Sequence, residues 1–414
     1  MLLSGIQFSR PLESGFRLKS CRNDNFLDFC KRLTLTDIFT LEMPSSSAIT
    51  IFMCGDVMTG RGIDQILPWP SVPHIFEPYV RDARGYVDLA EDISGPLPKP
   101  AGFSYVWGDA LDILARLAPD VRVINLETSV TACEEYWQGK GINYRMHPRN
   151  ITAITAAGID VCALANNHVL DWGYAGLAET LATLKEVGIG IVGAGRNLAE
   201  AAAPAIVTIK GKGRVLVFSC GDESSGIPAD WEATAATPGV YLLRDLGDET
   251  VRAFAARVSD AKEAGDIVIA SIHWGGNWGY EIPREQIAFA HRLIDEARVD
   301  IIHGHSSHHV KGIEVYRGRP VIYGCGDFIN DYEGIGGNGQ YRGELGLMYF
   351  VQMDPVSGKL AGLRMQPTLM KRFRVNGASQ ADALWLCDML NREGRRFGTR
   401  VAMEDDGTLV LQWR

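Results

Sequence analysis

The chain has 414 residues, enough for about two to three domains of ordinary size or for one large layered domain. Hydrophobic residues make up 46% of it and charged residues 22%, so it can bury a core, which excludes a disordered, collagenous or disulfide-scaffold protein. The net charge of −9 provides no basic surface for nucleic acid or for an anionic membrane.

Residues 1–48 form an N-terminal extension without the period of a helix or a strand. We expect either a flexible segment or residues upstream of the true start, for which Met43 is the candidate. The extension contains no good signal peptide, and no apolar run in the chain reaches the roughly 18 residues that span a bilayer. The eight cysteines are scattered without a C-x-x-C pair, which favours buried thiols over a zinc or disulfide framework. We therefore expect a cytoplasmic protein with no membrane segment.

Short apolar runs alternate with amphipathic stretches from residue 49 onward. The predicted strands are 49–54, 121–126, 161–166, 190–195, 214–220, 267–272, 300–304 and 320–325, and the predicted helices are 109–118, 173–188, 248–265 and 284–299. The continuous hydrophobicity of the strands is typical of sheets covered on both faces. This alternation predicts an α/β fold of β-sheets layered with flanking helices.

Two regions depart from the alternation. Residues 66–107 are rich in proline and aromatic residues, and we predict an insertion that covers one edge of the sheet and serves as a lid or binding loop. After residue 331 the pattern predicts a hairpin, a helix over 381–397 and a final hairpin. We therefore expect a main domain over 49–330, with 331–414 as a C-terminal α+β cap on the same body.

Polar residues that are informative about function stand where the predicted strands end. They are Gly55-Asp56, Glu127, Asn166-Asn167-His168, His273, His303, His305, His308 and His309. Ligands of α/β sheets bind beyond the carboxyl ends of the strands, so these side chains are expected to share one crevice. Imidazole, carboxylate and amide donors suit one or two divalent ions, with Mn, Fe and Zn as the metals. One such residue alone is more often a helix cap or a core histidine, but the repetition favours a metal site.

Six strings carry a resemblance to a known family. In chain order they are FMCGDVMTGRG, INLETSVT, LANNHVLDWG, SIHWGGNW, IIHGHSSHHVKGIE and VIYGCGDFI. They resemble the bacterial capsule-synthesis CapA or poly-γ-glutamate-synthesis PgsA family, which belongs to the calcineurin-like metallophosphoesterase superfamily. The resemblance covers roughly residues 49–330 and implies a metallophosphoesterase-like fold.

The resemblance also implies roles for single residues. It implies that the metal ligands are Asp56, Glu127, Asn167, His273, His305 and His308, with Glu127 as the carboxylate that bridges two metals. It makes His168 the histidine that handles protons or an oxyanion, and Asp171 can orient that ring through a hydrogen bond. Arg61 is either a substrate-binding residue for a phosphate or carboxylate, or a surface residue at the start of a helix.

Three positions depart from the family pattern. Met58 stands where the superfamily commonly has a histidine ligand, and a thioether is a poor ligand for hard metals, so we expect a weaker or more open first site. Glu127 replaces the usual bridging aspartate. Ser306-Ser307 replace a His-Pro pair, which leaves His303 or His309 as alternatives to an assigned ligand.

The combined features predict a metal-dependent hydrolase that cleaves a phosphoester with a metal-activated water. The alternative is an accessory protein of poly-γ-glutamate or capsule polysaccharide biosynthesis with little or no catalysis. The expected partners are a small-molecule or polyanionic substrate and the capsule or polyglutamate machinery. The sequence leaves the oligomeric state open.

Overall fold

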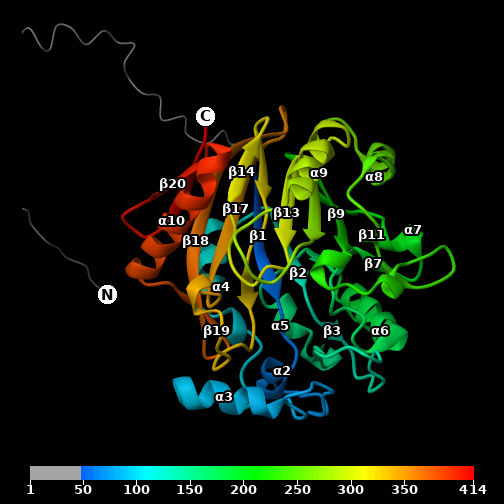
Figure 1. Cartoon of the computed structure of the whole chain (residues 1–414), viewed down its shortest axis with the longest axis vertical. Helices are drawn as coiled ribbons and strands as arrows, with labels where there is room; N and C mark the ends of the chain where they lie inside the picture. Colours follow the sequence, from blue (N-terminus) through cyan, green and yellow to red (C-terminus); the bar gives the residue numbers. More distant parts are fainter. Residues whose placement is uncertain (1–47) are drawn as a thin grey trace, which may run out of the picture. The chain divides into compact units, whose positions relative to one another are not determined.

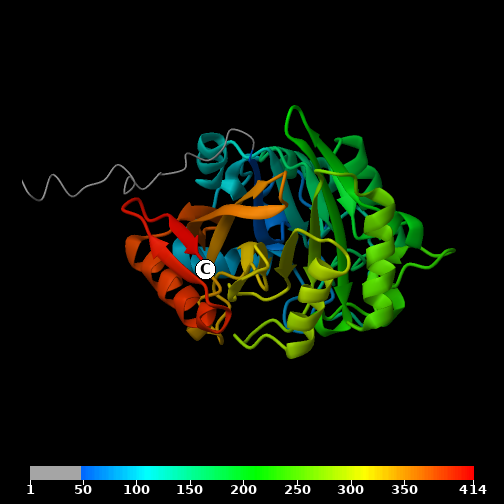
Figure 2. The same ribbon diagram turned by 90° about the horizontal axis from the view of Figure 1, so that it is seen from above.

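The structure, a computed structural model, describes residues 48–414 (Figure 1). The predictions for residues 1–47, including Met43, lie outside the described residues. In the described part, two large β-sheets pack against each other through a shared apolar core, and helices cover their outer faces (Figures 1 and 2). The predicted α/β layered fold is confirmed.

The first sheet has ten strands, and one half of it is parallel. Its main path is β20 (Arg400–Met403), β21 (Leu409–Gln412), β18 (Lys359–Lys371), β17 (Leu345–Asp354), β1 (Ile49–Val57), β2 (Val121–Leu126), β5 (Val161–Ala163) and β6 (Gly190–Val192), with β16 (Asp327–Ile329) beside β1 and β19 (Arg374–Gly377) beside β18. Strands β1, β2, β5, β6 and β16 run parallel, so their carboxyl ends lie at the same edge.

The second sheet has seven strands. They are β11 (Leu242–Leu243), β9 (Gly213–Asp222), β12 (Ile267–His273), β13 (Ile301–His305), β15 (Arg319–Ile322), β14 (Ile313–Tyr316) and β8 (Ala205–Ile209). Two short ladders are separate, and they pair β3 (Ser129–Val130) with β4 (Arg145–Met146) and β7 (Ala194–Gly195) with β10 (Gly239–Val240). The run from β11 to β15 is parallel, which again gathers carboxyl ends at one edge.

The α-helices of the described region are α2 (Gly62–Ile66), α3 (Arg84–Ser94), α4 (Ala110–Leu117), α5 (Thr152–Thr155), α6 (Gly173–Glu186), α7 (Leu198–Ala201), α8 (Asp248–Ala261), α9 (Arg284–Asp295) and α10 (Gln380–Gly394). Helices α4 and α6 contribute to the core on the outer face of the first sheet, and α8 and α9 to the core on the outer face of the second. None of the described helices is long and apolar enough to cross a membrane.

Strand β1 shows why the sequence pattern works. Ile51 and Met53 belong to the core between the sheets, whereas Phe52 and Cys54 belong to the core under the helices of the first sheet. Because side chains alternate across a strand, burial on both faces requires the unbroken apolar run seen in the sequence.

Several short elements were not predicted from the sequence, among them helix α3 and strand β8. Helix α3 lies inside the insertion 66–107, where we predicted no helix, and buries only Tyr86, Val87 and Ala90. Strand β8 has no fully buried residue, and Thr208 interrupts its short apolar run. The predicted C-terminal hairpins and helix are present, and β17 pairs directly with β1, so they extend the first sheet.

Candidate metal centre

Carboxyl ends of strands from both sheets meet at one site. Asp56 lies near the end of β1, Glu127 follows β2 and Asn167 follows β5, while His273 and His305 end β12 and β13. The two carboxylates and the two histidines are at most 2% exposed. The structure thus brings together side chains that are separated by up to hundreds of residues in the sequence.

Asp56 has a second carboxylate beside it. Asp327 opens β16, which runs parallel to β1 with Asp327 opposite Asp56. The backbone N–H of Asp56 donates to the carbonyl of Gly326 at 3.0 Å, and a Cβ at Gly55 would lie 1.6 Å from that oxygen. Only glycine fits at Gly55, so the Gly-Asp pairs at the ends of both strands allow the carboxylates to meet.

Two sets of donor atoms could each hold a metal ion. The ligand atoms of Asp56, His273 and His305 lie within 4.8 Å of one another, and so do those of Asp56, His308 and Asp327. Asp56 is common to both sets, as expected of two neighbouring metal positions.

Burial places three carboxylates close together without a lysine or arginine partner among the described residues. No lysine or arginine of residues 48–414 forms an ion pair with Asp56, Glu127 or Asp327. Burial, with the neighbouring Asp327, raises the pKa of Asp56 to about 7. Burial and the charge of Asp56 raise the pKa of Glu127 as well. Buried carboxylates are stable when paired or bound to metal, so the donor set fits one or two divalent cations.

His273 lies between the two carboxylate-bearing strand ends. Its Nε2 is 3.1 Å from Asn167 Oδ1 and 3.9 Å from Glu127 Oε1, and its Nδ1 is 2.8 Å from Nδ1 of His305. Burial lowers the pKa of both histidines well below the ordinary value, which keeps them neutral. A neutral imidazole is the form that ligates metals.

His308 has different surroundings. Its Nδ1 lies 2.9 Å from Asp327 Oδ1, and the other oxygen of that carboxylate accepts from Asn330 at 2.9 Å. Burial lowers the pKa of His308, but the charge and hydrogen bond of Asp327, with the charge of Asp56, together outweigh burial and raise the pKa. Asp327 therefore orients the ring and also offers an oxygen to the site.

His168 and Asp171 form a buried pair beside the donor sets. Nδ1 of His168 is 2.7 Å from Asp171 Oδ2, which also accepts from the backbone N–H of Tyr144 at 2.7 Å. Burial lowers the pKa of His168 to about 4 despite this carboxylate. The neutral ring donates from Nδ1 to Asp171, so Nε2, 3.9 Å from Glu127 Oε1, presents a lone pair to the site.

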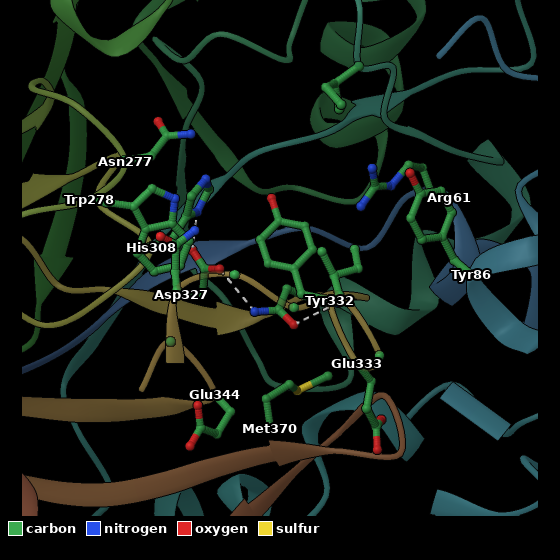
Figure 3. A pocket seen from close by; sticks show the side chains of 18 of the residues that line it. Arg61, Tyr86, Asn277, Trp278, His308, Asp327, Tyr332, Glu333, Glu344 and Met370 are labelled. Carbon is green, nitrogen blue, oxygen red and sulfur yellow. Dashed lines mark hydrogen bonds and ion pairs between the residues drawn. The ribbon is translucent and has the colours of Figure 1, made fainter. Parts of the chain in front are cut away.

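A cavity of about 840 Å³ opens onto the centre (Figure 3). Its lining includes Glu127, Asn167, His168, His308 and Asp327, together with residues of the insertion and of the segment 330–344. Figure 3 shows Arg61 and Tyr86 on one side, His308, Asp327 and Trp278 on the other, and Tyr332 between them. The cavity thus gives a molecule larger than water access to His308 and Asp327 of the second donor set.

The region that carries the strand-end motifs is similar to known proteins. The model of the family described as bacterial capsule synthesis protein PGA_cap matches residues 50–332. The chain belongs to this family. It is 50% identical over 364 residues to the "probable polyglutamine synthesis accessory protein" of Mycobacterium tuberculosis strain H37Rv, an alignment that covers 88% of this chain and 96% of the relative.

More distant members of the capsule synthesis family come from Bacillus. The "PGA biosynthesis protein CapA" of Bacillus subtilis strain 168 is 27% identical over 289 residues, which are 69% of this chain and 64% of that protein. The "capsule biosynthesis protein CapA" of Bacillus anthracis is 25% identical over 283 residues, which are 68% of this chain and 60% of that protein. The predicted family membership is confirmed.

Met58, which the resemblance places where the superfamily commonly has a histidine ligand, lies near the second donor set through Tyr332. The side chain is fully buried, and its sulfur lies 3.6 Å from the hydroxyl of Tyr332. Asp327 and His308 offer donor atoms within 4.8 Å of one another and of Asp56. Asp327 was not predicted as a donor, although it lies in the string VIYGCGDFI and its Gly-Asp pair repeats the pattern of Gly55-Asp56.

Arg61 is buried rather than on the surface. Its guanidinium pairs with Asp331 and with Glu77, at 2.5 and 3.2 Å, and lies 3.9 Å from the ring centre of Tyr86. Two carboxylates offset its charge, so Arg61 lines the cavity without a free positive charge. The network also fixes the insertion, which carries Glu77 and Tyr86, to the segment after β16.

The two histidines left open as alternative ligands have other partners. His303 lies near Ser271 and the carbonyl of Cys54, at 3.0 and 2.8 Å. His309 accepts from the backbone N–H of Gly279 at 3.1 Å. Neither belongs to a donor set found among residues 48–414.

Proposed function

We propose that this protein takes part in the production of polyglutamate or a related capsule polymer, and that it does so as a metal-dependent hydrolase of a phosphoester. The first part is supported by the names of its relatives, which are accessory or biosynthesis proteins for such polymers. The second part is supported by one observation: two buried sets of carboxylate and histidine donors share Asp56, and His308 and Asp327 of one set line a cavity.

The metal would be held by residues from both sheets. Asp56, His308 and Asp327 form one set of donors, and His273, His305 and Asn167 lie around the other, with Glu127 between them. A divalent ion there supplies Lewis acidity that lowers the pKa of water and stabilises charge on the substrate oxygens. The sets suit Mn, Fe or Zn because they combine imidazole with oxygen donors.

His168 is the residue best placed to move a proton. Asp171 fixes its Nδ1–H, so its Nε2 accepts a proton from the attacking water and, once protonated, passes it to the leaving oxygen. Lys140 donates to the backbone carbonyl of Asn167 at 2.5 Å and lies 3.4 Å from Asp171. It thereby holds the loop that carries both His168 and Asn167.

The cavity indicates a substrate with more than a lone phosphate group. Its volume of about 840 Å³ is in the range of sites for small organic molecules. Tyr79, which is 95% exposed, and Ile93 extend its wall from the insertion. The volume is large enough for the end of a polyanionic polymer or for a small phosphoester. Because the charge of Arg61 is offset, the metals would supply the positive charge that attracts such a substrate.

Turnover of bis(p-nitrophenyl) phosphate tests the hydrolase. The chain loaded with Mn²⁺ should cleave it, Asp56→Ala should not, and Asp405→Asn, which changes an exposed carboxylate in the C-terminal hairpin, should behave as wild type. Equal rates for wild type and Asp56→Ala would contradict the proposal.

A second candidate function is that of an accessory protein without catalysis. It is favoured by the names of the relatives and by Met58 at a ligand position. The two functions separate experimentally, because an accessory protein supports polymer production with Asp56→Ala, whereas the hydrolase does not.

A further inference from the structure

A line of hydrogen-bonded groups runs behind the metal centre. The carbonyl of Cys54 lies 2.8 Å from His303 Nε2, and His303 Nδ1 lies 3.0 Å from the hydroxyl of Ser271. The same hydroxyl is 2.9 Å from His305 Nε2, and His305 Nδ1 is 2.8 Å from His273 Nδ1. All four side chains are at most 1% exposed, so no solvent competes for these bonds.

Sheet register holds the line in place. On the adjacent parallel strands β12 and β13, Ser271 stands opposite His303 and His273 stands opposite His305. Because residues two apart on a strand point to the same face, all four side chains project to one side of the sheet. The line reaches β1 of the other sheet at Cys54, so it joins the two sheets beneath the site.

The donor and the acceptor of the first three hydrogen bonds follow from the carbonyl of Cys54 at the start of the line. A carbonyl oxygen only accepts, so His303 must donate from Nε2. The ring is fully buried and forms no ion pair among the described residues, so it is neutral with one N–H, which leaves His303 Nδ1 as an acceptor for the hydroxyl of Ser271. That hydroxyl has then used its proton, so its oxygen accepts from His305 Nε2.

We propose that His303 and Ser271 are positioning residues that hold His305 in the Nε2–H tautomer and so keep the lone pair of its Nδ1 free for a metal ion. This inference rests on the metal site of the proposed function. Nδ1 of His305 is 3.9 Å from Asp56 Oδ1, in the donor set that these two residues form with His273. The Nδ1–H tautomer of His305 would instead point a proton at that set.

The sequence feature behind this device is a Ser-x-His beside a His-x-His. The first histidine of IIHGH, His303, is then not a metal ligand. We call it the tautomer anchor, because it fixes the tautomer of His305 through Ser271. If His303 served only to fill the core, it would not determine the tautomer of His305. The tautomer of His305 can be measured.

Long-range ¹H–¹⁵N NMR of the full chain, labelled at its nine histidines and freed of metal with EDTA, reads the tautomers directly. We expect protonated Nε2 and bare Nδ1 for both His303 and His305, with assignments from single-histidine variants. A proton on Nδ1 of His305 would overturn the proposal whatever the activity of the protein.

Zn²⁺ titration calorimetry tests the consequence. Ser271→Ala should weaken Zn²⁺ binding by about 10–100-fold, the usual effect of losing a partner behind a ligand. His303→Gln, whose amide can still donate to Cys54 and accept from Ser271, should bind nearly as well as wild type, whereas His303→Ala should resemble Ser271→Ala. Wild-type affinity in Ser271→Ala would refute the device.

Asp56→Ala separates this inference from the proposed function. Loss of Zn²⁺ binding in Asp56→Ala, with no change in Ser271→Ala, contradicts the tautomer anchor alone. Unchanged binding in Asp56→Ala contradicts the metal site and the inference with it.

Discussion

Replacing Asp56 by asparagine should stabilise the metal-free protein while it removes metal binding. Burial and the neighbouring Asp327 raise the pKa of Asp56 from 3.8 to about 7. The folded state therefore holds a proton that the unfolded state releases. The stability contributed by this group is complete below pH 3.8 and is lost as the pH rises through about 7.

The size of the effect follows from the same two pKa values. The difference corresponds to roughly 4 kcal/mol at about 1.4 kcal/mol per pH unit. Asn125 and the backbone N–H of Ser306 donate to Asp56 at 2.7 and 3.2 Å, and asparagine keeps one of these bonds, at a cost of about 1 kcal/mol. We expect a net gain in the free energy of unfolding of about 2–3 kcal/mol at pH 8, and of less than about 1 kcal/mol at pH 5.

Urea denaturation in EDTA at both pH values measures this difference, with Asp405→Asn as the exposed control. Mn²⁺ should then raise the stability of wild type and of the control, but not that of Asp56→Asn, because a ligand stabilises only the state it binds. A loss of stability in Asp56→Asn at pH 8, or equal effects at the two pH values, would refute the electrostatic argument.

Three further predictions follow from buried groups. Arg61→Met should lower the free energy of unfolding by about 3–5 kcal/mol, because it leaves Glu77 and Asp331 buried without their cation; a change under about 1 kcal/mol in urea denaturation would contradict this. Burial, and then the charge of Arg396, lower the pKa of Lys311 to about 8, so wild-type stability should rise with pH from about 8 to 10.5. Lys311→Met should therefore gain about 3 kcal/mol at pH 7 by thermal unfolding, a gain that disappears near pH 10.5. His168→Ala should keep its metal in elemental analysis but hydrolyse a phosphodiester about 10²–10⁴-fold more slowly; loss of metal would make His168 a ligand.

The sequence predicted those parts of the fold that depend on local pattern. Strands such as β1 and β12 are buried on both faces, and their unbroken apolar runs are visible without a structure. Because parallel strands gather their carboxyl ends, Asp56, His273 and His305 could be expected near one another from strand order alone.

The rest of the site depends on long-range contacts that the sequence does not display. Strand β16 has three residues and no flanking helix, so Asp327 gave no pattern that placed it beside Asp56. The partners of Arg61 come from the insertion and from the segment after β16, and its charge could be interpreted only once both were in place. Likewise, the register of β12 and β13 is what turns His303 from a candidate ligand into a partner of Ser271.

Metal content of the purified full chain tests the central claim most directly. After loading with Mn²⁺ or Zn²⁺ and desalting, elemental mass spectrometry should find one to two metal ions per wild-type chain. Asp56→Ala and His273→Ala should retain markedly fewer metal ions per chain. The control Asp405→Asn should match wild type. A wild-type chain that retains no metal, or variants that retain as much as wild type, would contradict a metal centre at the ends of these strands.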